Sequence, residues 1–214
     1  SQFQPMSECS KIEWVVLDAM GVIYSIGRDV ENLLIPFLRE RGCEAPDDHI
    51  QRDYKACSLG HMNSDDFWMA CGMEAYDGLD CEYTFQHNLS AGLLPTLAAL
   101  RERGVHIACL SNDVSEWARL LRRRFRLDRW VEKWIISADV GLRKPNSLIY
   151  ARLLGELESK AENCLIVDDN MRNIEAAAKL DFQTMHFNRE ADGGAVGQFN
   201  KLLEMADLIE TSCR

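Results

Sequence analysis

The sequence predicts an α/β protein with a parallel sheet, helices on both faces of that sheet and a separate helical cap. Short apolar runs of strand length alternate with amphipathic segments of helix length from residue 91 to residue 190. This alternation is typical of a parallel sheet covered by crossover helices. Residues 25–90 instead contain four helix-like segments in succession. We therefore expect a core domain at residues 1–24 and 91–214 and a cap domain at residues 25–90.

Five apolar runs have the length of buried strands. The first lies within WVVLDAMGVIY at residues 14–24, where the apolar residues stop at Asp18 and the chain is expected to turn at Gly21. The other four runs are VHIACL, WIIS, CLIVD and QTMHF, at residues 105–110, 134–137, 164–168 and 183–187. In a parallel sheet the carboxyl ends of the strands meet at one edge, and ligands bind there.

The segments between these runs have helical patterns. LPTLAALRERG, at residues 94–104, has one apolar face and ends at Gly104, a helix stop signal. A second helix is expected at residues 115–125, with Asp113 as its cap. Two more are expected at residues 146–157 and at residues 173–180, where helix-forming residues dominate.

The cap helices are expected at residues 30–42, 48–60, 64–72 and 81–89, with short polar breaks between them. This insert directly follows the first strand, so we expect it to lie over the carboxyl edge of the sheet. A helical insert at that position can act as a lid that excludes water and selects the substrate.

The composition argues against two classes of partner. The net charge of −10 repels nucleic acid and anionic membranes, and no apolar run approaches the ~18 residues of a membrane span. The 8 cysteines form no CxxC pair, so we expect free thiols and a cytoplasmic location. The arginine-rich stretch at residues 119–129 is expected to be a solvated helix face.

Polar side chains gather where the predicted strands end. They follow four different strands, so a parallel sheet would bring them together: Asp18, Ser111, Asn112, Lys144, Asp168 and Asp169. Each residue alone has an ordinary explanation, such as a turn, a helix start or a helix cap. Their shared position at strand ends is what predicts a site.

Three carboxylates at one place repel one another and require a cation. A small set of hard oxygen ligands suits Mg²⁺, so Asp168 and Asp169 are expected to hold this ion, directly or through water. Asp18 could then attack an electrophilic phosphorus atom and form an acyl phosphate. The remaining polar groups would bind a small phosphorylated substrate and neutralise its phosphoryl oxygens: Ser111, Asn112 and Lys144.

Four segments, DAMGVIY, LSND, SADVGLRKPNSLIYARLL and CLIVDDNMRNIEAA, resemble the four motifs of the haloacid dehalogenase-like (HAD) hydrolase superfamily. The resemblance spans roughly residues 12–190, and the insert resembles the small helical cap of the subgroup with an insert after the first motif. It implies a Rossmann-like core, Mg²⁺ as cofactor, Asp18 as nucleophile and metal ligand, and Lys144 as a catalytic residue. It also implies that the backbone carbonyl of Met20 binds the metal and that Asn173 braces the acidic loop.

Met20 is where the sequence departs from the phosphatases that it resembles. These place an aspartate two residues after the nucleophile, which protonates the leaving alkoxide and later activates water. Methionine can do neither, and loss of a general acid costs about 10²–10⁴-fold in rate. Val22 also replaces the usual threonine. A cap residue could supply the proton, and the sequence offers His61, Asp65 and Asp66 as candidates.

Three hypotheses follow. The first is a Mg²⁺-dependent phosphohydrolase with a relocated acid. The second is cleavage of a carbon–phosphorus or carbon–halogen bond. Phosphonate cleavage would need a cap lysine, for which Lys55 is the sole candidate, while Asp168 and Asp169 argue against a metal-free dehalogenase. The third is a non-catalytic protein that binds a phosphorylated ligand or a protein partner.

Overall fold

Five parallel strands form one sheet in the order β3-β2-β1-β4-β5. The computed structural model describes residues 11–211. The strands are β1 (Trp14–Leu17), β2 (His106–Ser111), β3 (Lys133–Ile136), β4 (Cys164–Asp168) and β5 (Gln183–His186). Because all four pairings are parallel, the carboxyl ends of the strands lie at one edge. The predicted α/β fold class with its Rossmann-like sheet is therefore confirmed.

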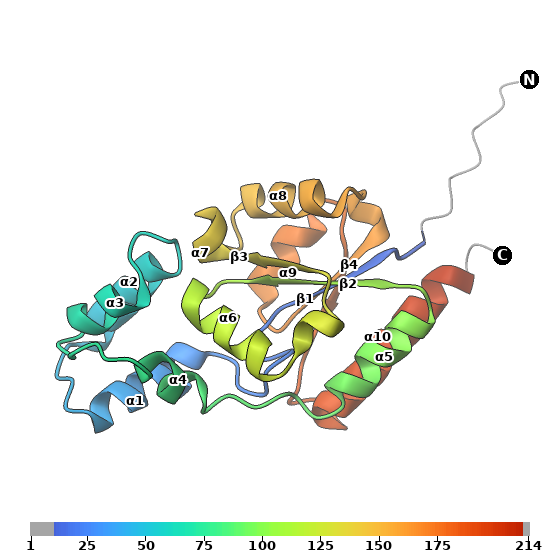
Figure 1. Ribbon diagram of the computed structural model, residues 1–214. Coiled ribbons are helices and arrows are strands. Elements are labelled where there is room, and N and C mark those ends of the chain that lie inside the picture. Colours follow the sequence, from blue (N-terminus) through green and yellow to red (C-terminus); the bar gives the residue numbers. More distant parts are fainter. Residues whose placement is uncertain (1–10, 212–214) are drawn as a thin grey trace, which may run out of the picture.

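Helices cover both faces of this sheet (Figure 1). On one face, α5 (Leu93–Glu102) and α10 (Gly194–Thr211) pack on Val15 and Leu17 of β1. On the other face, α8 (Ser147–Leu157) and α9 (Met171–Ala178) pack on Val16. Side chains alternate across a strand, so β1 is buried on both sides and reads as a continuous apolar run.

The remaining elements connect the strands of the core. They are α6 (Ser115–Arg124), η2 (Leu127–Arg129) and α7 (Ser137–Val140) around β3, and η3 (Ala161–Asn163) before β4. Helix α5 ends as the sequence predicts: Gly104 has a φ of 71°, and the N–H of Val105 bonds the carbonyl of Leu100.

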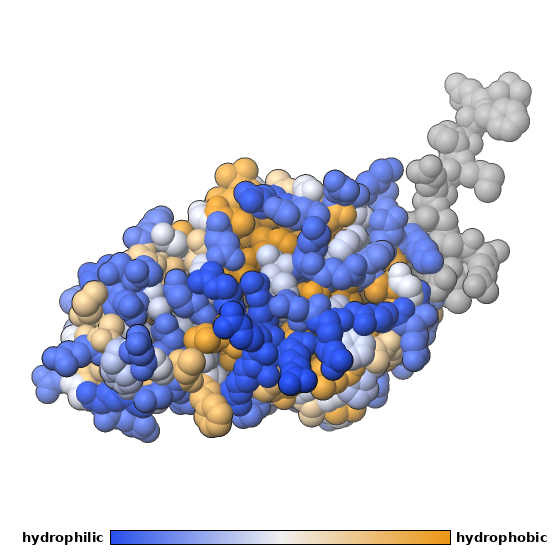
Figure 2. Space-filling view, viewed as in Figure 1, coloured by the Kyte–Doolittle hydropathy of each residue, from blue (hydrophilic) through white to orange (hydrophobic). Residues whose placement is uncertain are grey.

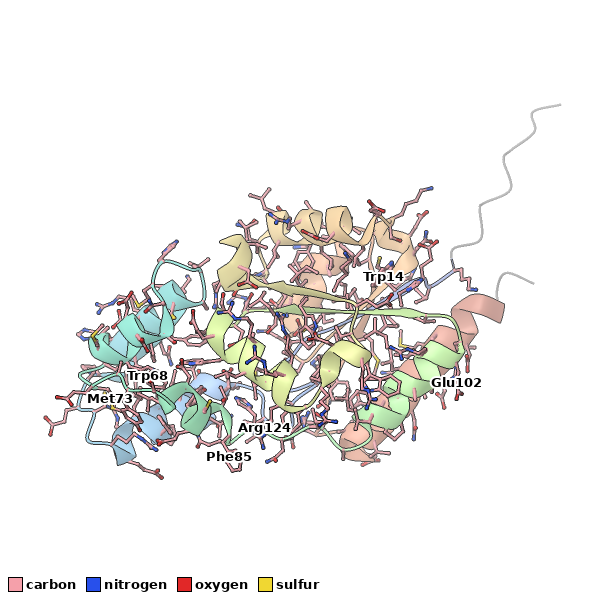
Figure 3. The ribbon with its side chains drawn as sticks, viewed as in Figure 1. Trp14, Trp68, Met73, Phe85, Glu102 and Arg124 are labelled. Carbon is pink, nitrogen blue, oxygen red and sulfur yellow. The ribbon has the colours of Figure 1, made fainter. Side chains whose placement is uncertain are left out.

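A group of short helices follows β1 and lies beyond the carboxyl ends of the strands (Figure 1). It consists of the π-helical turn η1 (Val30–Leu34), α1 (Ile35–Glu40), α2 (Asp47–Cys57), α3 (Ser64–Ala70) and α4 (Leu79–Thr84). These helices share an apolar cluster around Trp68, which Figure 3 labels. Trp117 of α6 enters the same cluster, with its ring centroid 5.4 Å from that of Trp68. Asp80 accepts hydrogen bonds from both indole nitrogens, at 2.8 and 2.7 Å.

Two local expectations were wrong, and one helix was missed. The helix expected at residues 81–89 stops at Thr84, because the following backbone pairs with the segment after β1: Ser25 donates to the carbonyl of Asn88, and Ser90 donates to that of Ile23. Asp113 does not cap α6, because its carboxylate bonds the adjacent N–H of Val114 instead. Helix α10 was not expected at all.

The arginine-rich stretch forms an exposed hydrophilic surface over α6 (Figure 2), as predicted. Arg124 also has a structural role, since its guanidinium bonds the carbonyls of Thr84, Phe85 and His87 and lies 4.5 Å from the ring centroid of Phe85 (Figure 3). Six cysteines are free, and Cys9 and Cys213 lie outside the described residues. None of the helices in the described part of the chain is long and apolar enough to cross a membrane.

Candidate active site

Three carboxylates meet at the carboxyl edge of the sheet. Asp18 follows β1, Asp168 ends β4, and Asp169 comes next in the chain. Register brings them together, because Leu17 pairs with Val167 across the two strands. One oxygen of each carboxylate lies within 4.8 Å of the others. The convergence expected from a parallel sheet is therefore present in the structure.

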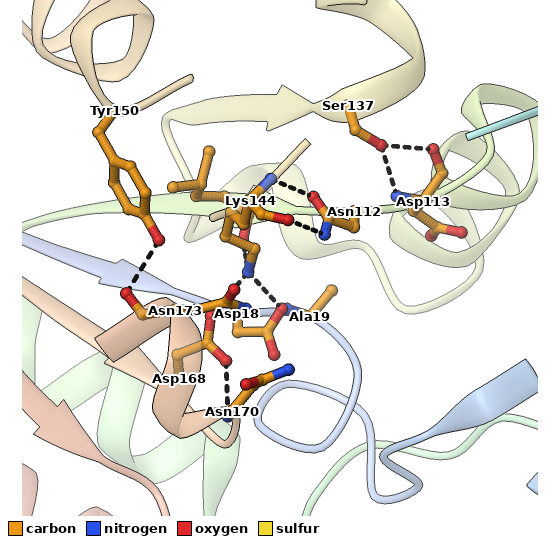
Figure 4. A network of polar contacts seen from close by, with 11 residues as sticks. Asp18, Ala19, Asn112, Asp113, Ser137, Lys144, Tyr150, Asp168, Asn170 and Asn173 are labelled. Carbon is orange, nitrogen blue, oxygen red and sulfur yellow. Dashed lines mark hydrogen bonds and ion pairs between the residues drawn. The ribbon is translucent and has the colours of Figure 1, made fainter. Parts of the chain in front are cut away.

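Lys144 lies between two of these carboxylates (Figure 4). Its Nζ donates to Oδ1 of Asp18 at 2.9 Å, to Oδ2 of Asp168 at 2.8 Å and to the carbonyl of Leu110 at 2.8 Å. The side chain is only 2% exposed. Burial lowers the pKa of Lys144, but the charges of Asp168 and Asp18 outweigh that effect and raise it above its ordinary value. The amine is therefore a cation with all three donors in use.

Asn112 fixes the backbone that carries this lysine. Its amide accepts from the N–H of Lys144 at 2.8 Å and donates to the carbonyl of the same residue at 3.0 Å (Figure 4). Ser111, the last residue of β2, is buried, and its Oγ has no hydrogen-bond partner among the described residues. A buried hydroxyl without a partner is costly, so Ser111 is available to donate to a ligand.

The acidic loop after β4 is braced from several sides. The Nδ2 of Asn173 donates to Oδ2 of Asp168 at 3.2 Å, and the N–H of Asn170 donates to Oδ1 at 2.9 Å. Tyr150 of α8 holds α9 in turn by donating to the carbonyl of Asn173 at 3.0 Å (Figure 4). His186 contacts the carbonyl of Asp169 at 3.0 Å. Asn173 thus contacts the acidic loop directly.

Two glycines make room for the carboxylate of Asp169. A Cβ built on Gly21, whose φ is 85°, would lie 2.1 Å from Oδ2 of Asp169. One built on Gly27 would lie 2.6 Å from the same atom. The turn after β1 therefore needs glycine both for its backbone conformation and for the close approach of an acid.

The charges of this cluster require a cation. Burial raises the pKa of Asp18 well above its ordinary value, the nearby charge of Asp168 adds to this effect, and Lys144 opposes it. One lysine compensates only one of three carboxylates. The carbonyl of Met20 accepts no hydrogen bond from the described residues and is free for a ligand. This set of hard oxygen donors fits Mg²⁺.

The comparison with families of known proteins agrees with this geometry. A family model described as haloacid dehalogenase-like hydrolase matches residues 12–181. The chain belongs to the haloacid dehalogenase-like hydrolase family. The superfamily resemblance seen in the four motifs is thereby confirmed.

Curated relatives of this HAD-like hydrolase have different activities. Glyceraldehyde 3-phosphate phosphatase of Pyrococcus furiosus is 26% identical over 159 residues, which cover 73% of this chain and 62% of that protein. (S)-2-Haloacid dehalogenase 4A of Burkholderia cepacia is 27% identical over 97 residues, which cover 45% of this chain and 42% of that protein. The chain thus spans less than two thirds of the length of either relative.

Solved structures of HAD enzymes share the fold. A HAD family enzyme from Bacteroides thetaiotaomicron, in complex with magnesium and inorganic phosphate, superposes with a TM-score of 0.73. The two chains are 18% identical, and the alignment covers 85% of this chain and 97% of that one. At this identity the likeness establishes the fold alone. The chemistry is inferred from the residues of the site.

Asp18 and Asp169 of this HAD-like hydrolase line a cavity of about 540 Å³. Asp18, Met20 and Lys144 line its floor. Its wall includes residues that sequence patterns did not identify: Arg28, Asp29, Tyr54 and Arg143. Arg143 directly precedes Lys144, and that proximity was the one available signal. The other three belong to the cap segment, whose orientation over the sheet is not readable from periodicity.

The cap residues suggested as substitutes for the missing acid lie elsewhere. His61, Asp65 and Asp66 are exposed and do not line this cavity. Lys55 is exposed as well and lines a neighbouring cavity of about 500 Å³ that shares Lys144 with the first. The structure thus argues against the three substitutes and keeps Lys55 near the site.

Proposed function

We propose that this HAD-like hydrolase is a Mg²⁺-dependent phosphohydrolase of a small phosphorylated metabolite, with Asp18 as nucleophile. The observation that carries the proposal is the cluster of three carboxylate oxygens within 4.8 Å beside a buried lysine. Relatives named glyceraldehyde 3-phosphate phosphatase support a phosphate ester as substrate class. Residues 25–90 would form the cap domain over the cavity, and residues 1–24 and 91–214 the core domain.

Mg²⁺, held by Asp18, Asp168, Asp169 and the carbonyl of Met20, would supply positive charge for the phosphoryl oxygens. Oδ2 of Asp18 would attack phosphorus, because Oδ1 already accepts hydrogen bonds from Lys144 and from the N–H of Ala19, at 2.9 Å each. These two donors orient the carboxylate toward the cavity. The bond from phosphorus to the leaving oxygen breaks, and an acyl phosphate remains on Asp18.

The phosphoryl group would be bound by groups that the fold holds ready. The Oγ of Ser111 has no hydrogen-bond partner within residues 11–211 and would donate one hydrogen bond to a phosphoryl oxygen. The buried amine of Lys144 adds a positive charge that three hydrogen bonds hold in place. Asn112 would contribute by holding the Lys144 backbone in place and by lining the cavity.

A substrate panel tests this function. Phosphate esters, phosphonates and 2-haloacids would be offered with Mg²⁺ and with EDTA, to the wild type and to Asp18→Asn. We expect phosphate release that needs Mg²⁺ and disappears in Asp18→Asn. Halide release without metal would select dehalogenation, for which the relative from B. cepacia is a precedent. Mg²⁺ binding without turnover across the panel would select a non-catalytic role.

A further inference from the structure

Asp29 is a buried carboxylate on the wall of the cavity that contains Asp18. It is 8% exposed and lines this cavity together with Asp18 and Met20. Its Oδ2 is buried and has no hydrogen-bond partner among the described residues. The residue precedes η1, where an aspartate usually caps the helix, yet its side chain makes no capping hydrogen bond.

Such a group is costly for stability, because a buried carboxylate oxygen without a partner loses its hydration, and the hydrogen bond that stabilises the charged form comes from the residue's own backbone. Unsatisfied polar groups of this kind in native proteins call for a functional explanation. Burial raises the pKa of Asp29 to about 6, so the carboxyl changes protonation state close to neutral pH. The ionisable groups that act on it come from six segments: Glu31, Tyr54, Tyr83, Asp113, Arg143 and Asp169.

The other groups that line this cavity are poorly suited to protonate the leaving group. Burial raises the pKa of Tyr54 well above its ordinary value. The thioether of Met20 carries no acidic proton, and Asp169 belongs to the carboxylate cluster. Glu31 lines the same cavity but is exposed and paired with Arg28 at 3.2 Å. Asp29 is thus the buried carboxyl in the cavity wall that neither the cluster nor an ion pair uses.

We propose that Asp29 is the general acid and base of the reaction and takes the role that an aspartate at position 20 would have. This inference rests on the proposed phosphohydrolase function. In the first step Asp18 attacks phosphorus, the bond to the leaving oxygen breaks, and protonated Asp29 gives its proton to that oxygen. An alcohol leaves, and Asp29 becomes a carboxylate.

The second step restores both aspartates. The Asp29 carboxylate takes a proton from a water molecule whose oxygen attacks phosphorus. The bond between phosphorus and Asp18 breaks, and inorganic phosphate is released. Asp18 is again a carboxylate and Asp29 is again protonated, so protons and electrons balance over the cycle.

The test compares two esters of the same ring, para-nitrophenyl phosphate and phenyl phosphate, with Mg²⁺. The nitrophenolate leaves without a proton, whereas phenolate is far more basic. In Asp29→Asn we expect kcat/KM for phenyl phosphate to fall about 10²-fold or more, with little change for the nitrophenyl ester. Slow release of phosphate from the acyl phosphate should then give a burst of nitrophenolate.

Two further variants sharpen the result. Adding Met20→Asp to Asp29→Asn should restore turnover of phenyl phosphate, because it supplies an acid at the position that the family's phosphatases use. Glu31→Gln is the matched control, since it removes a neighbouring carboxyl that is exposed and already paired. The pH profile of kcat/KM should lose a limb near the Asp29 pKa of about 6 in Asp29→Asn and keep it in Glu31→Gln.

Equal losses of kcat/KM for both esters in Asp29→Asn would assign Asp29 a merely structural role. Unchanged kinetics for both esters would exclude Asp29 from the reaction. Either result overturns the proposal. If the wild type hydrolyses neither ester nor any other phosphate compound with Mg²⁺, the proposed phosphohydrolase function fails, and the role of Asp29 fails with it.

Discussion

Gly27 determines how closely the carboxylate of Asp169 can approach the turn after β1. Its φ is not in the left-handed region, so alanine fits the backbone there, but the new Cβ would lie 2.6 Å from Oδ2 of Asp169. We expect Gly27→Ala to displace that flexible carboxylate and to weaken Mg²⁺ binding about 10-fold, with little change in stability. Isothermal titration with Mg²⁺ measures this.

The control for that change is Gly155→Ala in α8, where an added Cβ meets no atom within 4 Å. It should bind Mg²⁺ as the wild type does and gain stability, because alanine favours a helix by about 1 kcal/mol over glycine. Unaltered Mg²⁺ affinity in Gly27→Ala would show that Asp169 does not hold the ion.

Asp29 should reduce the stability of the fold that positions it. Burial raises its pKa from 3.8 in the unfolded chain to about 6, so the folded protein keeps a proton that the unfolded chain loses. Stability therefore decreases as the pH rises between these values and stays lower above them. The side chain of Asp29→Asn cannot ionise. Its free energy of unfolding should therefore exceed that of the wild type by near zero at about pH 4 and by about 3 kcal/mol above pH 6.

Urea unfolding of both proteins across that pH range measures the difference. Glu31→Gln should keep most of the pH dependence of the wild type, because the buried carboxyl of Asp29 stays in place. If the difference in unfolding free energy between Asp29→Asn and the wild type does not change with pH, burial does not raise the pKa of Asp29, and the prediction is wrong.

At the scale of elements, three cations besides Lys144 line the second cavity. Lys55 of α2, Arg143 before α8 and Arg172 of α9 line it, and no carboxylate does. None of the three forms an ion pair with a carboxylate in the described part of the chain. In a protein with a net charge of −10, such a cluster favours a second anionic group on the substrate.

Phosphoglycolate and ethyl phosphate test this preference, because they differ by one carboxylate. We expect Arg143→Gln to lower kcat/KM for phosphoglycolate about 10-fold more than for ethyl phosphate, the loss of roughly one charged hydrogen bond. Arg123→Gln is the control, because that exposed arginine of α6 lines neither cavity. Equal effects of Arg143→Gln on both esters would exclude a second anion subsite.

The sequence predicted the elements whose environment is uniform. Strands buried on both faces appear in the sequence as apolar runs. Four such runs are followed in the chain by the polar residues that meet at the candidate site. The end of α4 was missed because pairing of residues 88–90 with the segment after β1 overrides helix propensity, and no local signal reports a partner some 65 residues away in the chain. Asp29 was missed because its position depends on how the cap segment lies over the sheet. Arg143 was missed because its place directly before Lys144 does not by itself show that its side chain lines the cavity.

At the scale of the whole molecule, His87 lies where the cap helices meet the core. Its ring centroid is 5.7 Å from that of Tyr24, after β1, and 6.3 Å from that of Tyr83, in α4. Burial lowers the pKa of His87 to about 4, and the charge of Arg124 adds to this effect. The imidazole is therefore neutral in the folded protein throughout the physiological range.

This burial predicts acid sensitivity. The unfolded chain protonates His87 below about pH 6.5, whereas the folded protein resists protonation down to about pH 4. The contribution of His87 to stability is therefore lost as the pH falls through this window, by up to about 3 kcal/mol, whereas the contribution of Asp29 changes in the opposite direction. In His87→Phe, which cannot be protonated, we expect a shallower decline in urea-unfolding free energy over the same range. Parallel declines would mean that other groups cause the acid sensitivity.

The most direct test of the whole account is to trap the phosphorylated enzyme. The protein would be mixed with Mg²⁺ and a reactive aryl phosphate, quenched with acid within the first turnover, and mapped by peptide mass spectrometry. We expect a phosphoryl group on Asp18, absent in Asp18→Asn and more abundant in Asp29→Asn, where water activation is slow. A phosphoryl group on another residue, or undiminished turnover in Asp18→Asn, would contradict it.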